Sequence, residues 1–230
     1  MKDLLLLCPI RQYSSRCKLK MIKQFHNTTL TDIVLSKLEY IKKYNNTFED
    51  ITVAICRKDK ELYDIASKYN IKITDRNEKS VKTATKTNDI NYYLSGFKQN
   101  YVVWINGSAP FTTISNIIEV SNQFKNGDME SIHLIKERKN WFWKNNQPLN
   151  LELGKTRTQE IIPIYESIHT FYGYNRKYML NTGSYWNLQY NNPYLLLQKE
   201  SIENMDIDTD LDFKICEKIY KEIHETKDCS

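Results

Sequence analysis

The sequence predicts an α/β fold in which a mostly parallel central sheet carries helices on both faces. Between residues 4 and 126, short apolar runs alternate with segments whose apolar residues recur at helical spacing. The apolar runs are continuous, which is typical of parallel strands covered on both faces. A chain of 230 residues is long enough to bury the core of one such domain.

The predicted elements follow one another in a strand and helix order. The expected strands cover residues 4–8, 51–55, 71–73 and 101–105. The first expected helix has Thr31 as its N-cap and presents Val34, Leu38 and Ile41 on one face. Further helices are expected over residues 60–69, 90–97 and 114–126, the last one ending at Gly127. Parallel sheets bind ligands at the carboxyl ends of their strands, so the loops after Leu7 and Ile105 are the expected site of chemistry.

Residues 139–165 interrupt this order with a polar, aromatic-rich stretch that contains Trp141, Phe142 and Trp143. We interpret residues 1–230 as one domain and residues 139–165 as an inserted arm or dimerisation lobe. Exposed aromatic residues favour a partner surface, and a second subunit is the expected partner. A plain surface loop is the alternative.

Composition restricts the class of protein. The formal charge is +5, and the lysines are interspersed with acidic residues, so a pocket for a polyanionic small molecule is favoured over a nucleic-acid surface. No run approaches the roughly 20 apolar residues that span a bilayer. The five cysteines, which include Cys229, form no CxxC pair and indicate reduced thiols in a cytoplasm.

Residues 9–20, the basic loop, follow the first strand and read Pro-Ile-Arg-Gln-Tyr-Ser-Ser-Arg-Cys-Lys-Leu-Lys. A triphosphate carries several negative charges and many acceptor oxygens. Arg side chains bind such oxygens in pairs, Lys acts as a point charge, and Ser hydroxyls and backbone N–H groups complete the contacts. The composition of the loop is equally consistent with a solvated basic turn.

Asp206 and Asp208 stand near the far end of the chain, in the segment Asp-Ile-Asp-Thr-Asp-Leu-Asp-Phe. They alternate along an extended segment, so both carboxylates are expected on one side. Two carboxylates with oxygen-only chemistry suit Mg²⁺ bridged to substrate phosphates. Thr209 and Asp212 are expected to form a capping box that opens a helix. A merely acidic helix start is the alternative, and we prefer it for Asp210 and Asp212.

Together these two segments resemble the motifs of the CMP-N-acylneuraminate and CMP-Kdo synthetase family. The basic loop matches the family's P-x-R-x-x-S-x-R-x-x-x-K signature through Pro9, Arg11, Ser14, Arg16 and Lys20, and residues 206–213 match its D-I-D-T-x-x-D-F motif. The resemblance implies a Rossmann-like fold of the nucleotide-diphospho-sugar transferase type. It also implies that the loop binds the CTP phosphates, with Arg11, Arg16 and Lys20 as the catalytic cations, and that Asp206 and Asp208 bind Mg²⁺.

The resemblance weakens between these two motifs. Asn106 and Ser108 stand where the family has Gln and Thr near the nucleotide, and Arg76 stands where it has an Arg-Pro pair. The family's S-T-D-D segment retains only Asp59 in this sequence, which leaves its role open.

Arg157 and Gln159 echo the family's acceptor element. His169 lies in an apolar, strand-like run, where a histidine is more often a core residue, but it is also a candidate contact for the acceptor.

The expected activity is a cytoplasmic, magnesium-dependent cytidylyltransferase. It would transfer CMP from CTP to an acidic acceptor, which is a sialic-acid-like or other sugar acid or a phosphonate or phosphate, for the biosynthesis of surface glycans or related products. The resemblance further implies a homodimer, with no nucleic-acid or membrane partner. The alternative is a non-catalytic nucleotide-binding module or a subunit of a surface-glycan assembly complex.

Overall fold

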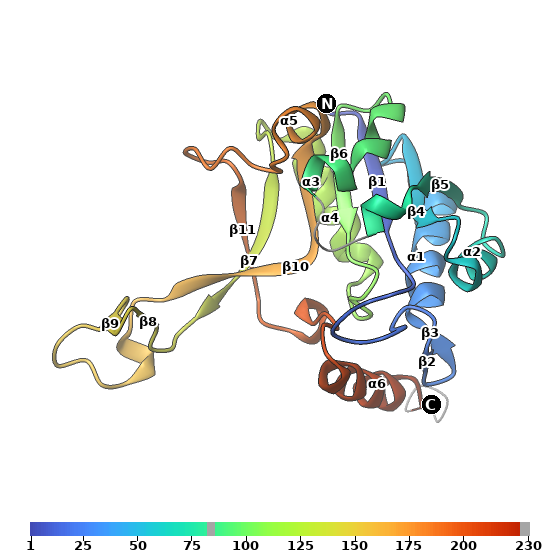
Figure 1. The fold of residues 1–230 in the computed structure, drawn as a ribbon. Coiled ribbons are helices and arrows are strands. Elements are labelled where there is room, and N and C mark those ends of the chain that lie inside the picture. Colours follow the sequence, from blue (N-terminus) through green and yellow to red (C-terminus); the bar gives the residue numbers. More distant parts are fainter. Residues whose placement is uncertain (82–85, 226–230) are drawn as a thin grey trace.

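The computed structural model describes residues 1–81 and 86–225. Within these residues, seven strands form one sheet (Figure 1). Their order across the sheet is β11 (Tyr194–Gln198), β7 (Ile132–Arg138), β10 (Ile164–Asn175), β6 (Tyr101–Ile105), β1 (Leu4–Pro9), β4 (Asp50–Cys56) and β5 (Lys72–Arg76). Strand β1 therefore lies near the centre, which agrees with its continuous apolar sequence.

The sheet is mostly parallel, as predicted. Strand β1 pairs in parallel with β4 and β6, β4 pairs in parallel with β5, and β11 pairs in parallel with β7. Strand β10 alone in this sheet, as far as the structure describes it, runs antiparallel to both of its neighbours, β6 and β7. Strand β10 thus lies between two parallel groups, the pair β11 and β7 at one edge and the four strands β6, β1, β4 and β5 on its other side.

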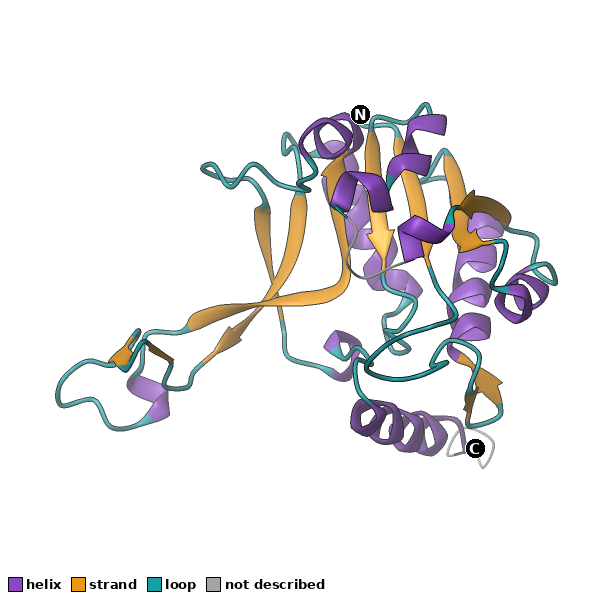
Figure 2. Cartoon of the chain, viewed as in Figure 1, coloured by secondary structure: helices purple, strands orange, loops and turns teal. Residues whose placement is uncertain are grey.

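Helices cover both faces of the sheet (Figure 2). The α-helices of the described chain are α1 (Leu30–Tyr44), α2 (Lys60–Ala66), α3 (Thr87–Ile90), α4 (Ile114–Asn126), α5 (Arg176–Thr182) and α6 (Asp210–Glu225). Helices α1 and α4 bury their apolar sides in one core with alternate residues of β1, such as Leu4 and Leu6. Leu5 and Leu7 point to the other face, where Met179 of α5 and Leu94 cover them.

Several predicted boundaries were wrong by a few residues. Thr29, and not Thr31, caps α1, because its hydroxyl accepts the backbone N–H of Asp32 at 3.1 Å. Thr31 is buried in the first turn and donates its hydroxyl to the Met21 carbonyl at 2.6 Å. The helix predicted over residues 90–97 is instead the single-turn helix α3 followed by a 3₁₀ turn, Tyr92–Gly96.

Residues 139–163 form the tip of a long arm that projects from the sheet (Figure 1). The outer parts of β7 and β10 pair along the arm, from Ser167 opposite Ile135 to Ile164 opposite Arg138. The tip holds the two-residue strands β8 (Trp143–Lys144) and β9 (Gln147–Pro148). The predicted insertion is therefore an extended ribbon rather than a separate globular lobe.

Two further expectations concern the cysteines and the membrane. Cys8, Cys17, Cys56 and Cys216 are free and buried, and Cys229 lies outside the described residues. Within residues 1–81 and 86–225, no helix is both long enough and apolar enough to cross a bilayer.

Candidate active site

A cleft opens where β1 and β6 end, at the edge of the sheet predicted to hold the chemistry. It has a volume of about 330 Å³. The basic loop forms one wall, and residues 104–108 with Asp208 form the other. The lining residues are Pro9, Ile10, Arg11, Ser14, Arg16, Lys20, Met21, Trp104, Asn106, Gly107, Ser108 and Asp208. A larger hollow of about 660 Å³ lies along α1 between Ser36 and Tyr44, and none of the predicted site residues line it.

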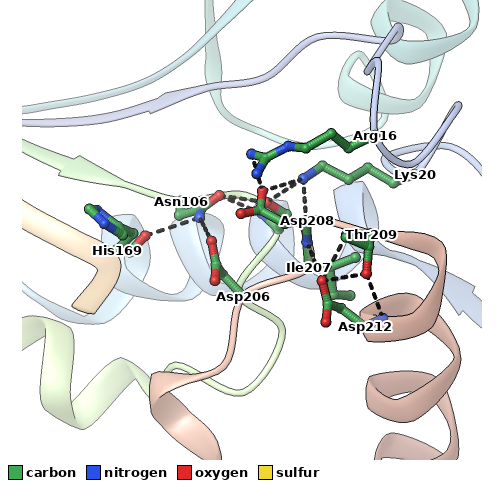
Figure 3. A network of polar contacts seen from close by, with 10 residues as sticks. Arg16, Lys20, Asn106, His169, Asp206, Ile207, Asp208, Thr209 and Asp212 are labelled. Atoms are coloured by element: carbon green, nitrogen blue, oxygen red, sulfur yellow. Dashed lines mark hydrogen bonds and ion pairs between the residues drawn. The ribbon is translucent and has the colours of Figure 1, made fainter. Parts of the chain in front are cut away.

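The basic loop contacts the acidic segment across this cleft (Figure 3). The Arg16 guanidinium donates to Asp208 Oδ1 at 2.6 Å, although the two residues are 192 positions apart. Lys20 Nζ donates to the Ser108 hydroxyl at 3.1 Å and to the Ile207 carbonyl. Burial lowers the pKa of Lys20, and the carboxylates of Asp208 and Asp206 oppose that shift. The structure thus brings together cations and carboxylates from opposite ends of the sequence.

Asp206 does not line the cleft itself but contacts Asn106, which does. Its Oδ2 accepts a hydrogen bond from Asn106 Nδ2 at 3.3 Å, and the same amide donates to the His169 carbonyl at 3.0 Å. Burial raises the pKa of Asp206, and the nearby negative charge of Asp208 raises it further. Ile207, between the two aspartates, is fully buried, so it holds this extended segment against the core.

The capping box predicted at residues 209–212 is present. Thr209 Oγ1 accepts the Asp212 N–H at 3.2 Å, and Asp212 Oδ2 accepts the Thr209 N–H at 2.7 Å. Asp212 Oδ2 also accepts the Asp208 N–H at 3.2 Å. The capping box therefore fixes the backbone of Asp208 as well as the start of α6.

His169 is exposed, so it is not a core residue, and it stays a candidate contact for the acceptor. Strand β10 loses its register with β7 between Ser167 and Tyr172, and His169 falls in this irregular stretch. His169 is exposed between the buried residues Ile168 and Thr170, so the apolar composition of the run misled, because His169 lies on the exposed side of the strand. His169 is close enough to Asp206 for its charge to lower the pKa of that carboxyl.

Three predicted site residues do not reach this cleft within one chain. Arg76 is buried, and its guanidinium donates to the hydroxyl and the carbonyl of Ser80. Arg157 and Gln159 belong to the tip of the arm, which Figure 1 places well away from the basic loop. Only a second chain could bring these two residues to the cleft.

Trp104 is a site residue that the sequence analysis did not assign. It lines the cleft and stacks on Tyr172 of β10, with ring centroids 4.8 Å apart. Trp104 could have been assigned from the sequence, because it lies near the end of a predicted strand, two residues before Asn106. Tyr172 is buried, so Trp104 is the member of the stacked pair that lines the cleft.

Comparison with known proteins decides the family. A family model described as cytidylyltransferase matches residues 5–226. The chain belongs to the cytidylyltransferase family. No curated protein sequence matches this cytidylyltransferase significantly.

Solved structures share its fold at low sequence identity. One is a CMP:2-keto-3-deoxy-manno-octonic acid synthetase complexed with CTP, at a TM-score of 0.69 and 11% identity, covering 96% of this chain and 99% of the other. The 4-diphosphocytidyl-2C-methyl-D-erythritol synthase of Anaerococcus prevotii reaches a TM-score of 0.66 at 12% identity, with the same coverage. The Francisella tularensis 2-C-methyl-D-erythritol 4-phosphate cytidylyltransferase reaches 0.60 at 16%, covering 93% and 98%. These likenesses confirm the Rossmann-like nucleotidyltransferase fold of this cytidylyltransferase.

Proposed function

We propose that this cytidylyltransferase transfers CMP from CTP to an acidic acceptor by in-line attack of an acceptor oxygen on the α-phosphorus, with release of pyrophosphate. The observation that carries the proposal is the contact of the basic loop with Asp208 in one cleft, with Asp206 bound to Asn106 of the opposite wall. Cations beside a carboxylate pair are what a reaction between a triphosphate and an oxygen nucleophile requires. A module that merely binds nucleotide has no such need for the carboxylate pair.

The basic loop would hold the triphosphate. Arg11, Arg16 and Lys20 line the cleft as cations, and Ser14 adds a hydroxyl. Arg16 pairs with Asp208, while its side chain is 65% exposed. An exposed ion pair of this kind is weak, so Arg16 can exchange its carboxylate for a phosphate at little cost. Asn106 and Ser108, on the opposite wall, would hydrogen-bond the ribose or the base.

Asp206 and Asp208 would hold Mg²⁺. The raised pKa of Asp206 reflects burial first and then the nearby Asp208, and a divalent cation would relieve that repulsion. Within the described residues no group of three or more His, Cys, Asp or Glu side chains could hold a metal. The remaining ligands would therefore be phosphate oxygens and water, which Mg²⁺ favours. When bound, the ion would neutralise charge on the reacting phosphate.

The acceptor would approach from the β10 side of the carboxylates, where His169 is exposed and Trp104 stacks on Tyr172. A sugar acid that reacts through a hydroxyl needs a base near the attacking oxygen, and His169 is a candidate for that role. An acceptor that is already anionic, such as a phosphonate or phosphate, needs none. Arg157 and Gln159 of a second subunit would supply the cationic and amide contacts that this side lacks.

Thermal unfolding with nucleotides tests the proposal. CTP with Mg²⁺ should raise the melting temperature more than ATP, GTP or UTP at the same concentration, because a ligand stabilises the folded state according to its affinity. Pyrophosphate release should then be assayed with CTP and a panel of sugar acids, phosphonates and polyol phosphates. Equal protection by ATP would remove the cytidine assignment. Release that is independent of every acceptor in the panel would argue against transfer.

A further inference from the structure

The basic loop is fixed to the rest of the protein on both sides of its exposed centre. On its C-terminal side, Arg16 and Lys20 bind the acidic segment as described above. On its N-terminal side, the Gln12 N–H donates to Asp59 Oδ2 at 3.0 Å, across 47 positions of sequence. Tyr13 and Ser15, between these attachments, are exposed. The basic loop is thus attached to the rest of the protein at both of its ends.

Asp59 lacks the hydrogen bond that an aspartate at the start of a helix normally makes. It is the N-cap of α2, and an aspartate at an N-cap normally accepts an N–H from the first turn of its own helix. The Asp59 side chain makes no such bond. The side chain that would cap α2 binds the basic loop instead.

The Asp59 carboxylate is also buried, with 5% of the residue exposed. A buried carboxylate is costly unless hydrogen bonds and opposite charges compensate it. Here the compensation comes from the Gln12 N–H and from Arg76, whose guanidinium is close enough for the two charges to interact.

The side chain of Gln12 is also fixed by a hydrogen bond. It is 4% exposed, and its Nε2 donates to Glu61 Oε1 at 3.2 Å. Its neighbour Arg11 lines the cleft and donates to the Val81 carbonyl at 3.0 Å. A shift of Gln12 would therefore displace Arg11 and also Ser14, which lies two residues further along the basic loop.

We propose that Asp59 is a positioning residue that holds the basic loop in the conformation that binds the triphosphate. The inference rests on the proposed function, because it assigns the loop to the phosphates of CTP. Asp59 acts through the Gln12 backbone and does not itself touch the nucleotide. Its loss should weaken triphosphate binding selectively, since the proposed contacts of the ribose or base, Asn106 and Ser108, lie on the other wall of the cleft.

Calorimetric titration of the full chain with CTP and with CMP, both with Mg²⁺, tests this role. Asp59→Ala should weaken CTP binding about tenfold, the size expected for a charge-assisted hydrogen bond, and should change CMP binding less than about twofold. Asp59→Asn keeps an oxygen that can accept the Gln12 N–H, so it should retain most of the CTP affinity. Asp64→Ala removes an exposed carboxylate from the same helix and is the matched control, with no expected change.

Different results would overturn different statements. Unchanged CTP binding by Asp59→Ala, or an equal loss for CTP and CMP that Asn does not restore, would overturn the positioning role alone. A wild-type chain that does not bind CTP would overturn the proposed function and this inference with it. If Asp59→Ala does not fold, Asp59→Glu provides the test, because it keeps the charge but displaces the carboxylate. It should show the same selective loss, and normal CTP binding would contradict the proposal.

Discussion

Asp208 and Asp212 lie four residues apart, and their carboxylates make different kinds of contact. Asp208 faces the cleft and pairs with Arg16, whereas Asp212 accepts backbone N–H groups at the start of α6. Partial burial opposes ionisation of Asp212, but hydrogen bonds from Thr209 and the Asp208 backbone outweigh it and lower its pKa. The first carboxylate is therefore assigned to chemistry and the second to structure.

Exchanging each carboxylate for an amide should separate these tasks. Asp208→Asn should fold almost normally and lose turnover by orders of magnitude, because it removes a charge from the proposed metal site. Asp212→Asn should lower the free energy of unfolding by roughly 1 kcal/mol, the value of a capping interaction, and keep most of the turnover. Chemical denaturation and pyrophosphate release measure the two effects. Near-normal turnover of Asp208→Asn with Mg²⁺ would place the metal elsewhere.

His133 should make stability depend on pH. It is 2% exposed, and within the described chain neither ring nitrogen has a hydrogen-bond partner. Burial, with a smaller contribution from His169, lowers the pKa of His133 from 6.5 to about 4. The folded protein thus resists a proton that the unfolded chain accepts, so stability is full above pH 6.5 and falls as the pH drops towards 4. The shift corresponds to about 3 kcal/mol.

His133→Phe should remove most of that pH dependence and leave stability at pH 7 unchanged or higher, because two unpaired buried polar atoms disappear. Urea denaturation between pH 4 and 8 measures it. His224→Gln is the control, since His224 is exposed at the end of α6. A wild-type curve that stays flat from pH 7 to 4.5 would contradict the assignment.

Among the elements, β10 and α4 approach each other closely at Gly173. A Cβ atom there would lie 2.6 Å from Phe124 Cε1 and 2.9 Å from Ile132 Cγ2. Phe124 is fully buried and packs edge-on against Tyr101 at 5.6 Å, so it has little room to move. The absence of a side chain at Gly173 is what allows the helix to lie on the reversed strand.

Gly173→Ala should therefore destabilise the protein by roughly 1–3 kcal/mol, as overpacking does in a tight core. Thermal or urea unfolding measures the loss. Combining it with Phe124→Leu, which makes room at the contact, should cost less than the sum of the two single changes. Strict additivity would mean that the clash is relieved elsewhere.

The elements differ in how well the sequence predicts them. The strands at residues 4–8, 51–55 and 101–105 were predictable because buried parallel strands are apolar throughout. The reversal of β10 was not, since pairing Phe171 with Ile105 and Asn175 with Tyr101 is a non-local choice that no local pattern specifies. Motif spacing indicated the basic loop and the carboxylate pair, and the structure brings them together. The burial of Arg76 and the exposure of His169 depend on tertiary contacts, so their places could be seen only in the fold.

For the molecule as a whole, the arm is the feature that needs a partner. Trp143 and Leu149 near its tip are 60% and 56% exposed, and β8 and β9 are too short to enclose a core. A two-fold dimer is the simplest assembly that covers such a surface. We expect light scattering at micromolar concentration to show a dimer, with each arm reaching the cleft of the other chain.

Mixed dimers test whether the arm acts in trans. A chain with Asp208→Asn mixed with a chain with Arg157→Ala should regain part of the activity, because one of the two clefts then has both residues intact. Leu153→Ala at the exposed tip is a matched control for Arg157→Ala, and it should keep normal activity on its own. A fully active monomer would rule out the arrangement. A proven heterodimer without activity, where each single variant is also inactive, would show that Arg157 serves its own chain.

The distance in sequence between Arg16 and Asp208 also sets how late in protein synthesis the complete cleft can form. During synthesis from the N-terminus, Asp208 follows Arg16 by 192 residues. At roughly 5–20 residues per second, a ribosome needs on the order of ten seconds or more to cover that interval. Throughout that time the nascent chain can fold its parallel strands, yet it has no carboxylate pair beside its cations. Premature termination anywhere before residue 206 would thus leave a chain without the proposed metal ligands, however well its first half had folded.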